Sequence, residues 1–166
     1  MKKRRFLFCS LLIVTCSLAF AQTAAEMDTL LETGAVSVAA ASRFVLGSAG
    51  LLPGLSGTGA ETAAYEEALS RGFVRAGAED EITLMDTAFL IMNVFEIKGG
   101  LMYSLFQSPR YAYREMIYRR LILGRAYSNM KVSGWQLLQI IGRTLNYTGE
   151  REEMDSMLIN SGASNE

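Results

Sequence analysis

Residues 132–145 decide the fold, and they read VSGWQLLQIIGRTL. Related stretches occur twice upstream: ITLMDTAFLIMNVF at residues 82–95 and VSVAAASRFVLGSA at residues 36–49. Aligned without gaps, each copy begins with a β-branched apolar residue and a hydroxyl residue, and then continues with an apolar helical pattern. Such self-similarity is the signature of a repeat architecture, so the sequence indicates three copies of one structural unit.

The hydroxyl residue of each copy is expected to cap the N-terminus of a helix. These residues are Ser37, Thr83 and Ser133. A Ser or Thr oxygen at this position can accept a hydrogen bond from an otherwise unpaired amide of the first turn. Asp86 and Gln136 stand three residues further on, where a capping-box partner belongs, whereas the first copy has Ala40 there and gives a weaker signal.

A further helical segment precedes each capped helix. The three segments are expected at residues 24–32, closed by Gly34, at Glu61–Arg75, with Gly72 as a closing residue, and at Arg110–Leu123, ended by Gly124. The capped helix of the second unit is expected to run from Leu84 to Phe95 and to end before Gly99-Gly100. The sequence therefore predicts an all-α fold in which three helix-loop-helix repeats pack as a small helical bundle.

Helical spacing also predicts which side chains face the core. They are Ala41, Phe44, Val45 and Leu51 in the first unit, Phe89, Met92 and Val94 or Phe95 in the second, and Tyr113, Met116, Ile117, Leu121, Leu138, Ile141 and Leu145 in the third. The strongly apolar stretch Leu101–Phe106 is expected to pack into the core as well. An exposed edge that binds a partner is the alternative interpretation of this stretch.

The N-terminus has the pattern of a secretory signal peptide. Basic residues 2–5 are followed by the apolar run Phe6–Phe20. The small residues Ala19 and Ala21 form a small-x-small motif immediately before a cleavage site between Ala21 and Gln22. A membrane anchor is the first alternative, but it needs a longer apolar span of about 20 residues. We therefore expect export to the periplasm or cell envelope, with no stable membrane span after cleavage.

Lipidation at Cys16 is a second alternative for the N-terminus. Thr15 is a poor residue before a lipidated cysteine, and the site after Ala21 is better. The predicted organisation is thus a signal peptide over residues 1–21, a helical repeat domain over residues 22–147, and a polar tail over residues 148–166. We expect this tail to be a frayed helix with a disordered end.

The composition argues against catalysis and against nucleic-acid binding. The chain has no histidine, and its two cysteines, Cys9 and Cys16, lie in the signal peptide, so the commonest general base and the thiol nucleophile are both missing. The carboxylates of Glu66-Glu67 and Glu79-Asp80-Glu81 are interpreted as solvated charge. Cleavage removes four of the 16 basic residues and leaves 12 basic against 17 acidic residues, a net charge of −5, so nucleic acid is not an expected partner. We expect a non-enzymatic protein without a metal or cofactor.

The repeated helix, loop and capped helix, with its (Ile/Val)-(Thr/Ser)-x-x-(Asp/Gln) start, resembles the S-layer homology domain. The resemblance spans roughly Asp28 to Tyr147 and implies a pseudo-threefold bundle of three repeats. In that family the second helix commonly starts with Ile-Thr-Arg-Ala-Glu, and the arginine helps to bind an anionic, pyruvylated cell-wall glycan. The matching positions here are Val38, Leu84 and Gly134, none of which is basic. The resemblance therefore implies the fold but not this binding chemistry.

The charges are distributed unevenly: acidic residues dominate positions 61–86 and basic residues dominate positions 108–143. One interpretation is that the two units pack together and neutralise each other. The other is that the third unit, where Tyr111, Tyr118 and Tyr127 alternate with arginines, binds an anionic surface. The candidate binding residues are Arg110, Arg114, Arg125, Lys131 and Arg143.

Two classes of function follow from these patterns. The first is a non-enzymatic, exported binding module that attaches to an anionic cell-wall polymer. The alternative is a structural or adaptor subunit that joins a periplasmic protein assembly through its apolar and basic surfaces. The expected partner is accordingly a cell-wall polymer or a periplasmic protein.

The first testable prediction concerns the mature N-terminus. Because a basic start, an apolar run and the Ala19-x-Ala21 site occur together, the exported chain should begin at Gln22. Intact-mass measurement of the exported protein checks this, and a first residue that is a lipid-modified Cys16 would contradict it.

Overall fold

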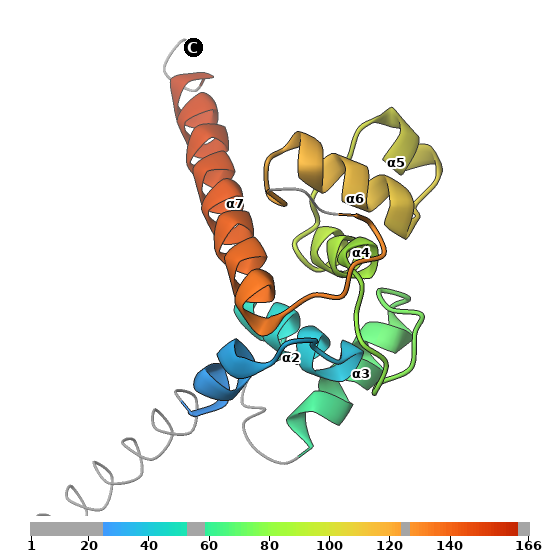
Figure 1. The fold of residues 1–166 in the computed structure, drawn as a ribbon. Coiled ribbons are helices and arrows are strands. Elements are labelled where there is room, and N and C mark those ends of the chain that lie inside the picture. The colour runs from blue at the N-terminus through green and yellow to red at the C-terminus, as the bar shows by residue number, and fades with distance from the viewer. Residues whose placement is uncertain (1–24, 53–58, 124–126, 163–166) are drawn as a thin grey trace, which may run out of the picture.

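The computed structural model describes residues 25–52, 59–123 and 127–162. Its labelled helices are α2 (Val38–Ser48), α3 (Ala60–Ser70), α4 (Leu84–Val94), α5 (Leu101–Leu105), α6 (Pro109–Tyr118) and α7 (Gly134–Gly162) (Figure 1). Residues 25–32 form one more helix before α2. Over the described ranges the only extended pairings are two isolated bridges, so the predicted all-α class is confirmed there. The predicted signal peptide, residues 1–21, lies outside these ranges.

The predicted N-caps are confirmed at all three helix starts. The hydroxyl of Ser37 accepts a hydrogen bond from the amide of Ala40 at 3.2 Å, and α2 begins at the next residue, Val38. Thr83 and Ser133 accept in the same way from the amides three residues on, both at 3.3 Å. These bonds satisfy first-turn donors that have no partner within the helix.

The residues just before the caps meet in a ring of backbone hydrogen bonds. The amide of Val36 donates to the carbonyl of Val132 at 2.9 Å, that of Val132 to Ile82 at 3.2 Å, and that of Ile82 back to Val36 at 2.9 Å. All three side chains are fully buried. The quoted stretches, far apart in the sequence, therefore start from one common point in the core.

A second set of bonds repeats around this ring. The residue two positions after each ring residue donates to the chain that leads into the next ring residue. The pairs are Val38 to Asp80 at 2.9 Å, Leu84 to Met130 at 2.9 Å, and Gly134 to Thr33 at 3.0 Å. Equivalent bonds thus link the first unit to the second, the second to the third, and the third back to the first.

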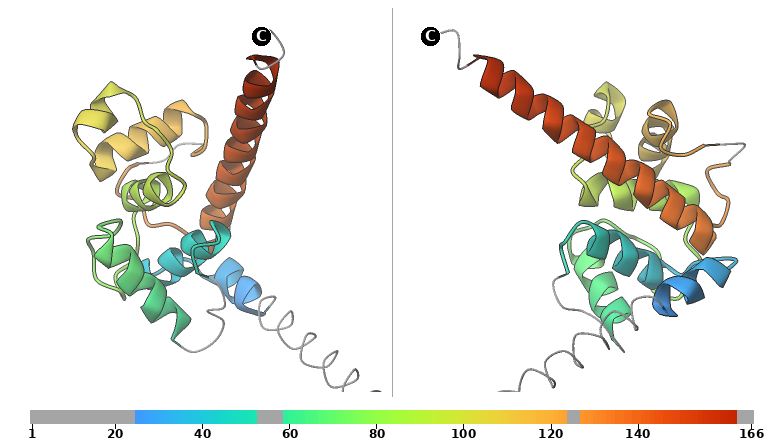
Figure 2. Two further views of the ribbon diagram at one scale, coloured as in Figure 1. Left: turned by 180° about the vertical axis from the view of Figure 1, so that it is seen from behind. Right: turned by 90° about the vertical axis from the view of Figure 1, so that its left-hand side faces the viewer.

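The helices follow the same cyclic order. α2 packs mainly on α3, α4 packs mainly on α6, and α2, α4 and α7 contact one another around the centre (Figure 2). The central layer contains the fully buried Ala41, Thr87 and Leu137, which occupy the same position in the three capped helices. The hydroxyl of Thr87 has no hydrogen-bond partner among the described residues.

One helix end differs from the expected position and one agrees with it. α6 ends at Tyr118, several residues before the expected end at Leu123, whereas α4 ends at Val94, next to the expected end at Phe95. Each helix is followed by a non-glycine residue with positive φ, Glu96 at 49° and Arg120 at 59°. By contrast, Gly72 has the expected left-handed conformation, with φ of 72°, two residues after the end of α3.

Parts of the predicted core are also wrong. Leu51, Ile117 and Leu145 are exposed. In α7 the buried residues include Leu137 and Ile140, which turns the buried face of the helix away from Leu145. Apart from the stretch Leu101–Phe106, the other expected core positions are buried or partly buried against the core.

The last helix includes most of the polar tail. We expected a frayed helix in the tail that begins at Thr148, and α7 continues without interruption from Gly134 to Gly162. Its C-terminal end extends past the other helices (Figure 2). The chain therefore carries a helical end that projects from the bundle.

The close approach at Gly134 generates the second prediction. A Cβ atom there would lie 1.6 Å from the carbonyl oxygen of Leu30, whereas a Cβ atom at Gly142 would meet nothing within 4 Å. Gly134→Ala should therefore lower the free energy of unfolding by about 3 kcal/mol or more, because the backbone of the first unit must move. Urea unfolding measures the effect.

Gly142→Ala is the matched control for this prediction. It makes the same chemical change in the same helix and should raise the unfolding free energy by up to about 1 kcal/mol in dilute solution. Equal unfolding free energies for the two variants would contradict the proposed packing of Gly134 on Leu30.

Candidate functional site

The most exposed apolar side chains of the described chain include those of α5. Leu101, Met102, Leu105 and Phe106 have exposed fractions of 73%, 55%, 64% and 59%. This stretch was expected to pack into the core, and that expectation is wrong except at Tyr103. Four neighbouring large apolar side chains in solvent cost hydration free energy, which is why such patches commonly mark binding surfaces.

Tyr103 anchors α5 to the bundle. Its side chain is buried, and a Cβ atom at Gly99 would lie only 2.5 Å from its ring, so the glycine allows the ring to lie against the backbone. Burial raises the pKa of Tyr103, while a hydrogen bond with Asn93 lowers it by less. The anchored tyrosine holds the opposite, apolar side of α5 toward solvent.

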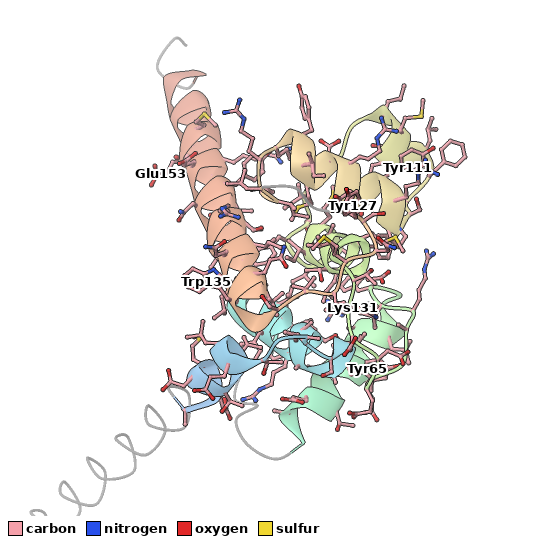
Figure 3. The ribbon with its side chains drawn as sticks, viewed as in Figure 1. Tyr65, Tyr111, Tyr127, Lys131, Trp135 and Glu153 are labelled. Atoms are coloured by element: carbon pink, nitrogen blue, oxygen red, sulfur yellow. The ribbon has the colours of Figure 1, made fainter. Side chains whose placement is uncertain are left out.

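Helix α6 adds basic and aromatic groups beside α5. Arg110 and Arg114 are exposed on consecutive turns of α6, and neither makes an ion pair with the described part of the chain. The ring of Tyr111 stacks on that of Phe106, with centroids 6.2 Å apart (Figure 3). Tyr118 is 84% exposed. A groove of about 310 Å³ between the two helices is lined by residues that include Met102, Arg114 and Tyr118.

We call this region the α5–α6 surface and define it by its exposed side chains. They are Leu101, Met102, Leu105, Phe106, Arg110, Arg114 and Tyr118. The surface combines apolar, aromatic and guanidinium groups, which are the groups most enriched in protein interfaces.

The remaining predicted binding residues do not join this surface. Lys131 donates to the carbonyl of Glu81 at 2.8 Å, with the Glu81 carboxylate 3.9 Å away, so it links the third unit to the second. Arg143 is half-buried and donates to the carbonyl of Leu121 at 3.4 Å and to Gln139 at 3.2 Å. Arg125 lies outside the described residues. Of the five predicted residues, only Arg110 and Arg114 are described as exposed neighbours on one helix.

Arg119 has a role in the fold that sequence reasoning missed. Its guanidinium pairs with Glu115 at 2.8 Å and donates to the carbonyl of Lys98 at 2.6 Å. It also contacts the hydroxyl of Tyr147 and lies over the ring of that residue, 5.3 Å from the centroid. This arginine thus joins α6, the loop after α4, and α7. A carbonyl acceptor leaves no trace in the sequence, so spacing could not identify the contact.

The positions that match the arginine of the S-layer homology family are closed to ligands in this chain. Val38 and Leu84 are fully buried. Gly134 has no room for any side chain, because the carbonyl of Leu30 occupies that space. Binding chemistry must therefore come from other residues than these.

The described residues contain no group of three or more His, Cys, Asp or Glu side chains placed to hold a metal ion. Among the same residues, no helix combines the length and apolar character needed to cross a lipid bilayer. Burial raises the pKa of Tyr113, as it does that of Tyr103. Comparisons of the chain with protein-family models, curated proteins and solved structures found no match.

The contrast between Arg119 and Arg114 gives the third prediction. Arg119→Ala should lower the unfolding free energy by about 1–3 kcal/mol, because it leaves the half-buried Glu115 carboxylate without its cation and removes packing on Tyr147. Arg114→Ala changes an exposed residue of the same helix and should stay within about 0.5 kcal/mol of the parent chain. Thermal and urea unfolding measure both, and a larger loss at Arg114 would refute the assignment.

Proposed function

We propose that this protein is an exported, non-enzymatic structural or adaptor subunit of a protein assembly in the cell envelope. The observation that carries the proposal is the α5–α6 surface. Its four apolar side chains are held in solvent by an anchored helix, which gives the fold itself no hydrophobic stabilisation. A partner that covers them would recover that free energy.

The chemistry of the surface favours a protein over a sugar polymer. Leu101, Met102 and Leu105 offer aliphatic area, which matches an apolar protein surface better than a hydrated glycan. Phe106 and Tyr118 add rings, and Arg110 and Arg114 add planar cations at the edge. Aromatic residues and arginine are the residues that most often dominate binding energy at the centre of protein interfaces. We therefore propose a partner with an apolar centre and carboxylates around it.

Attachment to an anionic cell-wall polymer is the second candidate. It is favoured by the exposed guanidinium groups of Arg110 and Arg114, which can bond phosphate or carboxylate groups in a bidentate way. It is supported by fewer residues than the sequence indicated, because Lys131 and Arg143 donate to carbonyl groups of the fold.

The proposal also includes secretion of the protein and its similarity in architecture to the S-layer homology domain. The basic start, apolar run and Ala19-x-Ala21 site support secretion. The cyclic hydrogen bonds of Val36, Ile82 and Val132 support an S-layer homology-like arrangement of three units. The proposal takes only the architecture from that family, since its arginine positions are occupied here by Val38, Leu84 and Gly134.

The fourth prediction tests the partner class in living cells. A photo-crosslinking amino acid at Leu105 should give a discrete crosslinked protein band, because this exposed residue belongs to the apolar part of the α5–α6 surface. The same amino acid at Glu66, which is exposed on α3, is the matched control and should give none. Loss of the band in Arg110→Glu/Arg114→Glu would show that the cations contribute to binding.

A parallel measurement decides between the two candidates. The exported protein is mixed with purified cell wall and sedimented at low and high salt. A salt-sensitive pellet that disappears in the Arg110→Glu/Arg114→Glu variant, with no crosslinked band at Leu105, would refute the adaptor proposal and support polymer binding.

A further inference from the structure

A second apolar surface lies on α7, away from the α5–α6 surface. Trp135, Leu138, Gly142 and Leu145 follow one another at spacings of three and four residues, which places them on one side of the helix. Trp135 is 59% exposed and Leu145 is 42% exposed. Figure 3 shows Trp135 and Glu153 on the side of α7 that is turned away from α6. We call these four residues the α7 stripe.

A groove runs along this stripe. It has a volume of about 560 Å³, and Leu138, Gly142 and Leu145 line one wall. The opposite wall comes from the first unit and includes Met27, Phe44 and Leu52, with the Arg43–Glu26 ion pair near them. The lining is thus mostly apolar, and it lies between the third unit and the first.

The pseudo-threefold arrangement allows the α7 stripe to be compared with the equivalent faces of α2 and α4, each of which packs against another helix. Counted from the ring residues, the α7 stripe corresponds to Ala39, Ser42, Leu46 and Ala49 of α2, and to Met85, Ala88, Met92 and Phe95 of α4. The amides of Ala39 and Met85 donate to carbonyls of the next unit, both at 3.0 Å, so this side of each helix faces the next unit. There α2 packs on α3 and α4 packs on α6.

Burial confirms that the first two faces are covered and the third is open. Leu46 and Met92 are fully buried, whereas Gly142 at the matching position is exposed. Ser42 and Ala88 are fully buried where Leu138 is only partly buried, and Ala49 and Phe95 are partly buried where Leu145 is exposed. The helix that should cover α7 spans only residues 25–32, and it reaches the start of α7 at Gly134. Among the residues that the structure describes, one of three equivalent helix-packing sites is therefore left unfilled beyond the first turns of α7.

The glycines of α7 give an independent indication. Gly142 and Gly149 lie inside a continuous helix, where glycine costs about 1 kcal/mol relative to alanine. A Cβ atom at either position would meet nothing within 4 Å, so packing within the described chain does not require them. Glycine at a helix surface allows the backbone of another helix to approach closely.

We propose that α7 of a second copy of this chain fills the groove, in an antiparallel and reciprocal pairing. The reason is that no other described helix covers the stripe side of α7, and that α7 continues past the bundle to Gly162. A two-fold pairing lets each copy cover the open site of the other, as in isologous dimers. No other described helix extends beyond the bundle in this way (Figure 1).

The sequence of α7 selects the register. With Gly142 on the two-fold axis, Leu138 faces Leu145 of the second copy, and the large Trp135 faces the small Gly149. Large residues are thus opposite small ones and leucines are opposite each other, which is the arrangement that close-packed helices need. From Trp135 to Gly149 the contact is about 21 Å long.

Charge favours the antiparallel direction. Glu150, Glu152 and Glu153 follow the stripe, and in this register they lie beside the start of α7 in the second copy. The N-terminus of a helix carries a partial positive charge, so these carboxylates are stabilised there. A parallel pairing would instead place the acidic segments of both copies side by side.

The fifth prediction is measured on the full exported chain by sedimentation velocity. The parent chain should be dimeric at about 0.1 mM, a concentration that populates even a modest specific interface. Leu145→Asp should weaken association by at least about tenfold with unchanged helicity, because it places a charge in the apolar contact. Leu105→Asp, the control on α5, should leave the dimer intact. Partner binding through the α5–α6 surface and dimerisation through the α7 stripe involve separate residues, so either proposal can be refuted without the other.

Disulfide crosslinking tests the register without relying on a destabilising change. Gly142→Cys should give a disulfide-linked dimer on mild oxidation, because Gly142 faces itself across the axis, and Glu66→Cys on α3 should not. A parent chain that is monomeric at this concentration would overturn the proposal. So would a dimer that persists in Leu145→Asp and fails to crosslink at Gly142→Cys.

Discussion

The ring of hydrogen bonds among Val36, Ile82 and Val132 is the interaction on which the rest of the structure depends. These residues are fully buried, so an amide or carbonyl left unpaired there would cost about 1–3 kcal/mol. Each bond joins a different pair of units, and none can be replaced by a local turn. The ring therefore fixes where the three capped helices start and the order in which the units contact one another.

Among the described residues, two of the three contacts between units are filled by this order and one is not. The segments between the ring residues are long enough to supply α3 and α6, whereas the described residues before the first ring residue, 25–35, supply only the short helix 25–32. Gly134 allows this short helix to touch the backbone of α7, but the contact ends there. The open side of α7 is thus a consequence of how the ring closes, and it arises independently of α5.

Features that depend on residues close together in the sequence were predicted more accurately than features that depend on the tertiary structure. Caps at Ser37, Thr83 and Ser133 depend on residues three positions apart, and they were predicted correctly. The end of α6 at Tyr118 was not predicted, because the positive φ at the non-glycine residue Arg120 has no signal in the composition. The stretch Leu101–Phe106 was misplaced because apolar content alone cannot tell a core helix from an exposed one.

The candidate site was only partly predictable for a related reason. An arginine or lysine in the sequence shows that a positive charge is present but does not show which group it binds. A backbone carbonyl acceptor cannot be recognised from the sequence, because every residue has one. Lys131 and Arg143 bond to such carbonyls, which leaves the exposed pair of Arg110 and Arg114 beside α5. The α5–α6 surface and the α7 stripe belong to different elements on different sides of the bundle (Figure 3). A dimer formed through α7 would therefore keep both α5–α6 surfaces free, so that two partners could be joined by one pair of chains.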